Sequence, residues 1–286
     1  MNGRFFIILA VTFFSLVETS SPARAATEIV PPRVTLTAAN PVGVLTITND
    51  RNIQTGYDIE VFGWAQEPDG KVLLTPTTNI RAEPAALDIQ AHGSAKLRVI
   101  ALVSPPPPGS AEKVYRIRIS ERPDRQRDET EKDVQVIAWF SLPVFHKPEK
   151  TTYKGRLSVG PIADGKLTFA VHNDGTEHTY IGRALVSGQD GTGKEIFSIE
   201  RQGWYVLAGG KLEFKAAIAA EDCLRSHLVT VTARVLESDD GLSASVTPNK
   251  ALCGDGKVSE FPIPGLKKMP EGFKLGDALP NAPTPQ

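Results

Sequence analysis

Short stretches of alternating apolar residues, separated by turn residues, run through the first half of the chain. Tyr57 to Trp64 alternates, Pro68-Asp69-Gly70 forms a tight turn after it, and Tyr115 to Ile119 alternates again. Period-two alternation indicates strands, and Asp-Gly is a strong hairpin signal. Because no window in this half repeats apolar residues at helical spacing, about seven or eight strands at the spacing of a β-sandwich are expected.

The second half repeats this pattern, so the chain is predicted to be all-β with two sandwich domains. Its expected strands are 167–171, 180–186, 203–207, 211–214 and 227–235. Pro148 lies near the predicted hinge between an N-terminal domain (26–147) and a C-terminal domain (148–262). Residues 263–286 are rich in Pro and Gly without periodicity, which predicts a flexible tail.

The first 25 residues have the features of a secretory signal peptide. Arg4 precedes an apolar core from Phe5 to Val17, and Ala23-Arg24-Ala25 supplies small residues for cleavage. No apolar run reaches the roughly 18 residues of a membrane span, so no direct membrane insertion is expected. The mature chain would hold 30 basic and 32 acidic residues, a balance that gives no electrostatic basis for binding nucleic acid.

Only two cysteines occur, Cys223 and Cys253. An even pair in an exported protein predicts one disulfide, the alternative being two unpaired buried thiols.

The run from Asp133 to Phe145 has apolar residues on both parities, which is unusual for a strand with one face in water. Pro143 lacks a backbone N–H and is therefore expected at the margin of a sheet or at a bulge. These features predict a long apolar edge strand, a structure that invites pairing with another chain. The alternative is an ordinary last strand, covered within its own domain.

Motifs for catalysis or cofactor binding are weak. Residues 188–194, GQDGTGK, have the spacing of a phosphate loop, but Glu195 stands where Ser or Thr would bind magnesium, so a loop between strands is predicted. His172 and His178 bracket a turn without a third zinc ligand. No nucleophile elbow and no clustered acid pair occurs. The sequence predicts no enzyme, no cofactor and no metal.

The first half resembles the PapD-like periplasmic chaperones of pilus assembly. The resemblance covers residues 31–148 and rests on PPRVTL, LTITND, DGKVLLTPT, LRVI, EKVYRIRISERP and SLPVFHKP, in that order and spacing. HNDGTEH (172–178) and GWYVLAGG (203–210) look closest to the archaic, alternative branch of chaperone-usher systems. The resemblance implies two immunoglobulin-like sandwiches arranged as a boomerang.

The resemblance also implies a function. A chaperone of this kind binds pilin subunits in the periplasm, lends each a β-strand, and delivers it to an outer-membrane usher. The side chains implied to enter the subunit are one parity of the apolar run: Val134, Val136, Ala138, Phe140 and Leu142. The alternative is an exported immunoglobulin-like adhesive or scaffold protein.

Arg33 falls where the family places a cleft arginine that binds the carboxylate at the subunit's C-terminus. The family's second anchor is a lysine, and here that position is Pro143. Arg116 and Arg118, on the preceding strand and expected to face outward, are the substitute anchors considered. The alternative is that both are solvated surface residues.

Three further residues resemble the family's ion-pair network between domains. These are Glu112, Lys147 and Asp239, with lysine at 147 in place of the usual arginine. Lysine keeps the charge but loses the forked geometry of a guanidinium. Their implied role is to fix the angle between the two domains.

Overall fold

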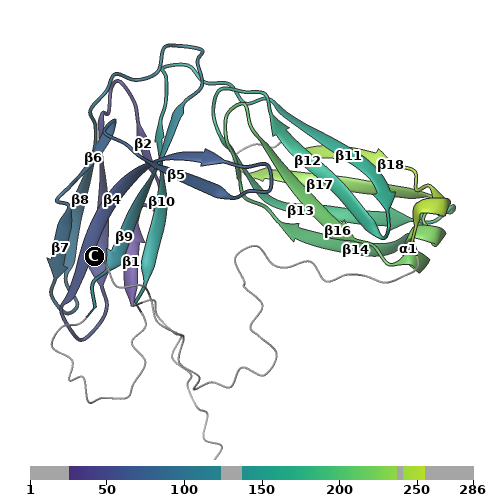
Figure 1. Cartoon of the computed structure of the whole chain (residues 1–286), viewed down its shortest axis with the longest axis horizontal. Helices are drawn as coiled ribbons and strands as arrows, with labels where there is room; N and C mark the ends of the chain where they lie inside the picture. Colours follow the sequence, from purple (N-terminus) through teal and green to yellow (C-terminus); the bar gives the residue numbers. More distant parts are fainter. Residues whose placement is uncertain (1–25, 124–136, 237–240, 255–286) are drawn as a thin grey trace, which may run out of the picture.

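Two β-sandwiches set at an angle make up the computed structural model (Figure 1). It describes residues 26–123, 137–236 and 241–254. The predicted signal peptide and tail lie outside these residues. Among the described residues, no helix has the length and apolar character needed to span a bilayer.

The first sandwich packs a four-stranded sheet against a six-stranded one. The smaller sheet has the order β1-β3-β8-β6, formed by Thr27–Val30, Val42–Asn49, Ser94–Ala101 and Ile80–Glu83. The larger sheet has the order β2-β10-β9-β4-β5, and β7 pairs with β4. Its strands are Val34–Leu36, Trp139–His146, Lys113–Glu121, Thr55–Gln66, Val72–Pro76 and Ala86–Ile89.

Alternation in the sequence explains how these two sheets bury one face each. In β9 the side chains of Tyr115, Ile117 and Ile119 point between the sheets and are at most 3% exposed. In β4 the same side is formed by Tyr57 and Ile59. Apolar residues two apart share a face of a strand, so one row from each strand fills the core.

The second sandwich packs a three-stranded sheet against a five-stranded one. The smaller sheet has the order β11-β12-β16, with strands Gly155–Ala163, Lys166–Asn173 and Lys211–Ala217. The larger has the order β14-β13-β17-β18, and β15 pairs with β13. Its strands are Glu195–Gln202, Thr179–Gln189, Leu228–Leu236, Gly241–Val246 and Tyr205–Val206.

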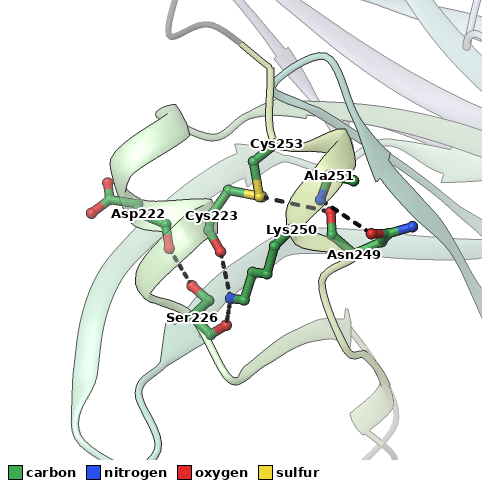
Figure 2. Close-up of a disulfide and its surroundings, with 7 residues drawn as sticks. All are labelled: Asp222, Cys223, Ser226, Asn249, Lys250, Ala251 and Cys253. Carbon is green, nitrogen blue, oxygen red and sulfur yellow. Dashed lines mark hydrogen bonds between the residues drawn. A yellow bond between two sulfur atoms is a disulfide. The ribbon is translucent and has the colours of Figure 1, made fainter.

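Two short helices at the far tip of the second sandwich carry the cysteines (Figure 1). Cys223 lies in α1 (Ala220–Arg225), and Cys253 directly follows the 3-10 helix η1 (Lys250–Leu252). The two form a disulfide, as predicted, with Cα atoms 5.6 Å apart. Figure 2 shows Lys250 beside it, its Nζ donating to the carbonyl oxygens of Cys223, at 2.9 Å, and Ser226.

The two sandwiches touch through the long hairpin of β4 and β5, which extends toward the second domain in Figure 1. Gln66 Nε2 donates to the carbonyl oxygen of Tyr205 at 2.8 Å. At the hairpin tip, the carbonyl oxygen of Pro68 accepts from the backbone N–H of Glu213 at 2.6 Å. β10 ends at His146 and β11 begins at Gly155, and the predicted boundary between residues 147 and 148 falls in the segment between them.

The all-β prediction with two sandwiches is confirmed. Strands β1, β6, β11, β14 and β18 were not predicted, and neither were the two helices. Residues 188–194 lie at the hairpin between β13 and β14, where Asp190 Oδ1 accepts from the backbone N–H groups of Thr192 and Lys194. The prediction of a loop between strands is therefore confirmed there.

Candidate functional site: the open edge of strand β10

Strand β10 has neighbours on both sides over only part of its length. It pairs with β9 in antiparallel register from Trp139↔Ser120 to His146↔Lys113. On its other side it pairs with β2 in parallel register, but only from Val144↔Val34 to His146↔Leu36. Among the described strands, none pairs with residues 137–142 on that side. The sheet therefore has an open edge at the start of β10.

Two backbone hydrogen bonds establish which groups of β10 face this edge. Ala138 is bonded to β9, because its carbonyl oxygen accepts from Glu121 N–H at 2.9 Å. Lys147 is bonded to β2, because its N–H donates to the carbonyl oxygen of Leu36 at 2.9 Å. Antiparallel pairing alternates, so even-numbered residues direct their backbone groups toward β9. Trp139 and Ser141 direct theirs toward the open edge.

Pro143 lies where the open edge ends. It belongs to the odd-numbered set, so the N–H that proline lacks would have faced the open side rather than β9. The missing donor therefore breaks no bond within the sheet. This placement accords with the expectation of proline at a sheet margin.

The even-numbered side chains of β10 point into the core of the first sandwich. Val144 is fully buried there, Leu142 is 6% exposed, and Phe140 packs against the same core. Ala138, one step further out, is half-buried. The row thus runs out of the core toward the segment that contains Val134 and Val136, which lies outside the described residues.

The five side chains predicted to enter a subunit (Val134, Val136, Ala138, Phe140 and Leu142) therefore do not all have the same environment. Leu142 fills the core of its own domain, which differs from the expectation that it faces a partner. Phe140 is partly buried and also packs against this core. Within the described part of the row, Ala138 lies nearest the outer end. The second half of β10 is covered within its own domain, as in the alternative of an ordinary last strand, whereas no described strand covers the outer edge of residues 137–141.

The odd-numbered side chains point to the opposite face, which turns toward the second domain. Phe145 is fully buried against it, whereas Ile137 is 47% and Trp139 is 67% exposed. Both faces of the open stretch are therefore apolar, as the sequence predicted.

Arg33 and Arg116 lie on either side of Pro143. Arg33 immediately precedes β2, one step before the pair Val34↔Val144, and is half-buried. Arg116 is the direct partner of Pro143 in β9. The position where the family has its lysine is thus flanked by an arginine on each neighbouring strand segment.

Arg116 is buried, so the expectation that it faces outward into solvent is wrong. The residue is 3% exposed, its Nη1 donates to the carbonyl oxygen of Ser141 at 3.1 Å, and its guanidinium lies 3.8 Å from the ring centre of Trp64. Burial lowers its pKa to about 10, with Tyr205 opposing that shift. The guanidinium therefore stays charged at neutral pH. Its Nε and Nη2, like Trp64 Nε1, are buried without a hydrogen-bond partner among the described residues.

Arg118 behaves differently. Its Nε donates to Glu60 Oε2 at 2.9 Å, its guanidinium lies over the ring of Phe62 at 4.9 Å, and its side chain is 39% exposed. Glu60 already supplies a carboxylate, so a second one would have to compete with it.

Glu112 and Lys147 lie at the junction of the two domains, where their side-chain partners are residues that the sequence did not predict. His178 donates to Glu112 Oε1 from its backbone N–H and approaches it with Nδ1 at 2.7 Å. Lys147 Nζ donates to Glu177 Oε2 at 2.8 Å. Asp239, the third predicted member, lies outside the described residues. The motif HNDGTEH supplies both Glu177 and His178 and was the signal available.

Aromatic rings fill the rest of this junction. Phe145 stacks on His178 with ring centres 3.4 Å apart and planes 7° apart. Tyr205 contacts Phe145 at 5.7 Å and Trp64 at 5.6 Å. Trp204, 38% exposed, lies 5.7 Å from the guanidinium of Arg116. Rings from both sandwiches thus pack against one another at this junction.

His146, at the end of β10, is expected to make the stability of the protein sensitive to acid. It is fully buried and neither ring nitrogen has a hydrogen-bond partner among the described residues. Burial, with help from the charge of Lys113, lowers its pKa below the ordinary 6.5. Below pH 6.5 the unfolded chain then binds a proton that the folded chain refuses. The free energy of unfolding should therefore fall as the pH drops from 7 toward 5.

When one proton is bound on unfolding, the free energy of unfolding changes by at most about 1.4 kcal/mol per pH unit. Urea unfolding of wild type and His146→Phe at several pH values measures it, and the variant should show a smaller slope. His172→Gln is the comparison variant. Because burial also lowers the pKa of His172, this variant should likewise reduce the dependence of the unfolding free energy on pH. An identical slope in wild type and His146→Phe would contradict this assignment.

No group of three or more potential metal ligands occurs in the part of the chain that the structure describes. His172 Nε2 lies 2.8 Å from the hydroxyl of Ser158, and His178 contacts Glu112. The two histidines that bracket the turn are thus engaged with different partners.

Comparison with known protein families gives a match over the first sandwich. Residues 26–152 match the model of the Pili and flagellar-assembly chaperone, PapD N-terminal domain. Sequence comparison with curated proteins gives no match.

Among the solved structures with a similar fold are two from chaperone complexes. One is from the CsuC–CsuE chaperone-tip adhesion subunit pre-assembly complex of archaic chaperone-usher Csu pili of Acinetobacter baumannii. It has a TM-score of 0.55 at 17% identity and covers 79% of this chain and 100% of that chain. The other is from the SafA pilin–SafB chaperone complex of Salmonella enterica, with a TM-score of 0.51 at 14% identity, covering 79% and 99%. At these identities the likeness concerns the fold.

The first sandwich is thus a pilus-chaperone domain of the PapD type. This agrees with the resemblance predicted for residues 31–148, and with its second sandwich the chain has the two-domain fold of the pilus chaperones in these complexes. This family is non-enzymatic, in agreement with the prediction that the chain is not an enzyme.

Proposed function

We propose that this chaperone binds pilus subunits in the periplasm by donor-strand complementation, through the open edge of β10, and delivers them to an outer-membrane usher. The observation that carries the proposal is that edge. Residues 137–141 have β9 on one side and no described strand on the other, and apart from Ser141 their side chains are apolar on both faces. Such an edge is normally blunted because it invites pairing.

The chemistry of the partner follows from the row of even-numbered residues. Leu142 and Phe140 connect this row to the core of the first sandwich, and Ala138, Val136 and Val134 continue it in the sequence. A partner that accepts them must have an apolar groove that lacks one strand. Each well-buried aliphatic side chain contributes roughly 1.5 to 3 kcal/mol, so a few of them suffice for capture.

Arg33 gives the incoming strand a direction. It lies at the end of the open edge, beside Pro143 and immediately before β2. If Arg33 binds a terminal carboxylate, the last strand of the subunit runs parallel to β10, with its C-terminus at the arginine. A charge-assisted contact of this kind fixes register as well as adding affinity.

Arg116 is the better substitute for the missing lysine. It is the cross-strand partner of Pro143 and carries buried N–H groups that have no hydrogen-bond partner among the described residues, whereas Arg118 is occupied by Glu60. Reaching Arg116 would require movement of the neighbouring aromatic rings, because the guanidinium is buried. The CsuC–CsuE and SafA–SafB complexes contain an adhesion subunit and a pilin, respectively, which supports a subunit of this kind as the partner.

Co-expression with a pilin subunit from the same organism tests the proposal. Val136→Asp and Ala138→Asp each place a charge in the predicted row and should lower recovery of the complex by about tenfold or more, since one lost apolar contact is worth at least that factor. Gln135→Asp, with the opposite parity, is the matched control and should bind nearly as well as wild type.

Equal recovery with all three variants would contradict strand donation. Display of the protein on the cell surface, without a bound subunit, would instead favour the adhesive or scaffold alternative.

A further inference from the structure

A buried carboxylate stands at the point where β10 begins to pair with β9. Glu121 is the last residue of β9 and is 5% exposed. Its backbone N–H donates to the carbonyl oxygen of Ala138 at 2.9 Å, and its Oε2 accepts from the N–H of Ala138 at 3.2 Å. Both backbone groups of Ala138 are therefore bound by one residue.

The carboxylate is itself held by two other parts of the first sandwich. Thr27 in β1 donates its hydroxyl to Glu121 Oε1 at 3.0 Å and contacts the hydroxyl of Tyr57 at 2.9 Å. Arg51, which follows β3, donates to Oε2 at 2.8 Å. Because charge-assisted bonds are stronger than neutral ones, the position of this carboxylate is well determined.

The open stretch of β10 needs such a constraint. In most strands the register is specified by an apolar face and a polar face, because a slip by one residue exchanges them. Here Ile137 and Trp139 on one face, and Ala138 and Phe140 on the other, are all apolar. Hydrophobic patterning alone therefore discriminates poorly between this register and one shifted by a residue.

We propose that Glu121 is a positioning residue that sets the register of β10 by binding the backbone of Ala138. Pro143 acts in the same sense, since a shift by one residue would turn its position toward β9, where an N–H is required. A consequence for binding follows, and it rests on the proposed function. By fixing the register of β10, Glu121 determines which side chains the edge presents to a pilus subunit.

Amide exchange in the free full-length protein reports the register directly. In the described register, the amides of Phe140 and Leu142 face β9 and exchange slowly, whereas those of Trp139 and Ser141 face the open edge and exchange fast. A shift by one residue reverses this pattern. A loss of stability without a shift leaves the order of the four rates unchanged.

Glu121→Ala should lower the protection of Phe140 and Leu142 by about tenfold, as expected for one lost buried hydrogen bond, and raise that of Trp139 and Ser141. Arg51→Gln is the matched control. It removes the ion pair but leaves the carboxylate to accept from Ala138, so the wild-type pattern should persist. Should Glu121→Ala fail to fold, Ala138→Pro removes the same N–H from the other side and should give the same reversal.

Wild-type order of the four rates in the folded Glu121→Ala or Ala138→Pro variant overturns the inference, whatever the subunit does. Reversal in these variants and not in Arg51→Gln supports it. Adding the subunit separates the two claims. Undiminished capture by a register-shifted variant would count against donor-strand binding while leaving the role of Glu121 intact.

Discussion

Replacing Phe145 with alanine should lower the free energy of unfolding by about 3 to 5 kcal/mol, the range measured when a buried phenylalanine is truncated. The side chain is fully buried between the two sandwiches. It contacts Trp64, His178 and Tyr205, so its loss opens a cavity bordered by both domains. The second effect should therefore be a wider distribution of interdomain angles.

Denaturant unfolding and small-angle X-ray scattering measure these two effects on the same samples. Phe62→Ala is a suitable control, because Phe62 lies in the same sheet and on the same face but is only half-buried, against the guanidinium of Arg118. Phe62→Ala should lower the free energy of unfolding clearly less than Phe145→Ala does, and should leave the scattering profile unchanged. An unaltered profile together with a loss below about 1 kcal/mol for Phe145→Ala would show that this junction does not hold the domains.

The sequence predicts the fold well where the alternation of apolar and polar residues within one strand indicates which of its faces is buried. The alternation of Tyr115, Ile117 and Ile119 identifies both the strand and its inward face. Strands such as β14 were missed because charged and apolar residues mix in EIFSIERQ without a clear period. The helix α1 has only six residues, too few to display a helical repeat.

Arg116 shows where reasoning from a single strand fails. With Tyr115 and Ile117 inside, parity correctly places Arg116 on the other face. That face is not solvent, because Trp64 lies beside Arg116 within its own domain and Trp204 and Tyr205 approach from the second domain. Contacts between domains depend on the hinge geometry, which the periodicity of one strand does not contain.

The candidate site was predictable in part for the same reason. An apolar edge strand can be inferred from residues 133–145 themselves, including the margin position of Pro143. The role of Glu121 could not, because its partners Thr27, Arg51 and Ala138 are far apart in sequence and meet only after the sheets close. Likewise, the partners of Glu112 and Lys147 come from the turn that contains Glu177 and His178.

Loss of the disulfide should be the second large effect. It joins residues 30 positions apart, and closing a loop of that size stabilises a protein by about 3 to 4 kcal/mol in the chain-entropy model. Both sulfurs belong to buried residues at the tip of the second sandwich, where Lys250 also bonds to the carbonyl oxygen of Cys223. The double variant Cys223→Ala with Cys253→Ala should therefore destabilise the second domain selectively.

Hydrogen exchange separates the two domains in this experiment. Amides of β13 and β17 should lose protection in the double variant, whereas those of β4 and β9 should keep it, because the disulfide lies at the end of the molecule away from the first sandwich (Figure 1). Lys250→Met with the disulfide intact is the control, and removes only the bonds to Cys223 and Ser226. Reduction of the wild type should reproduce the double variant. Equal protection of β13 and β17 with and without the disulfide would mean that the β-sheet core alone determines the stability of this domain.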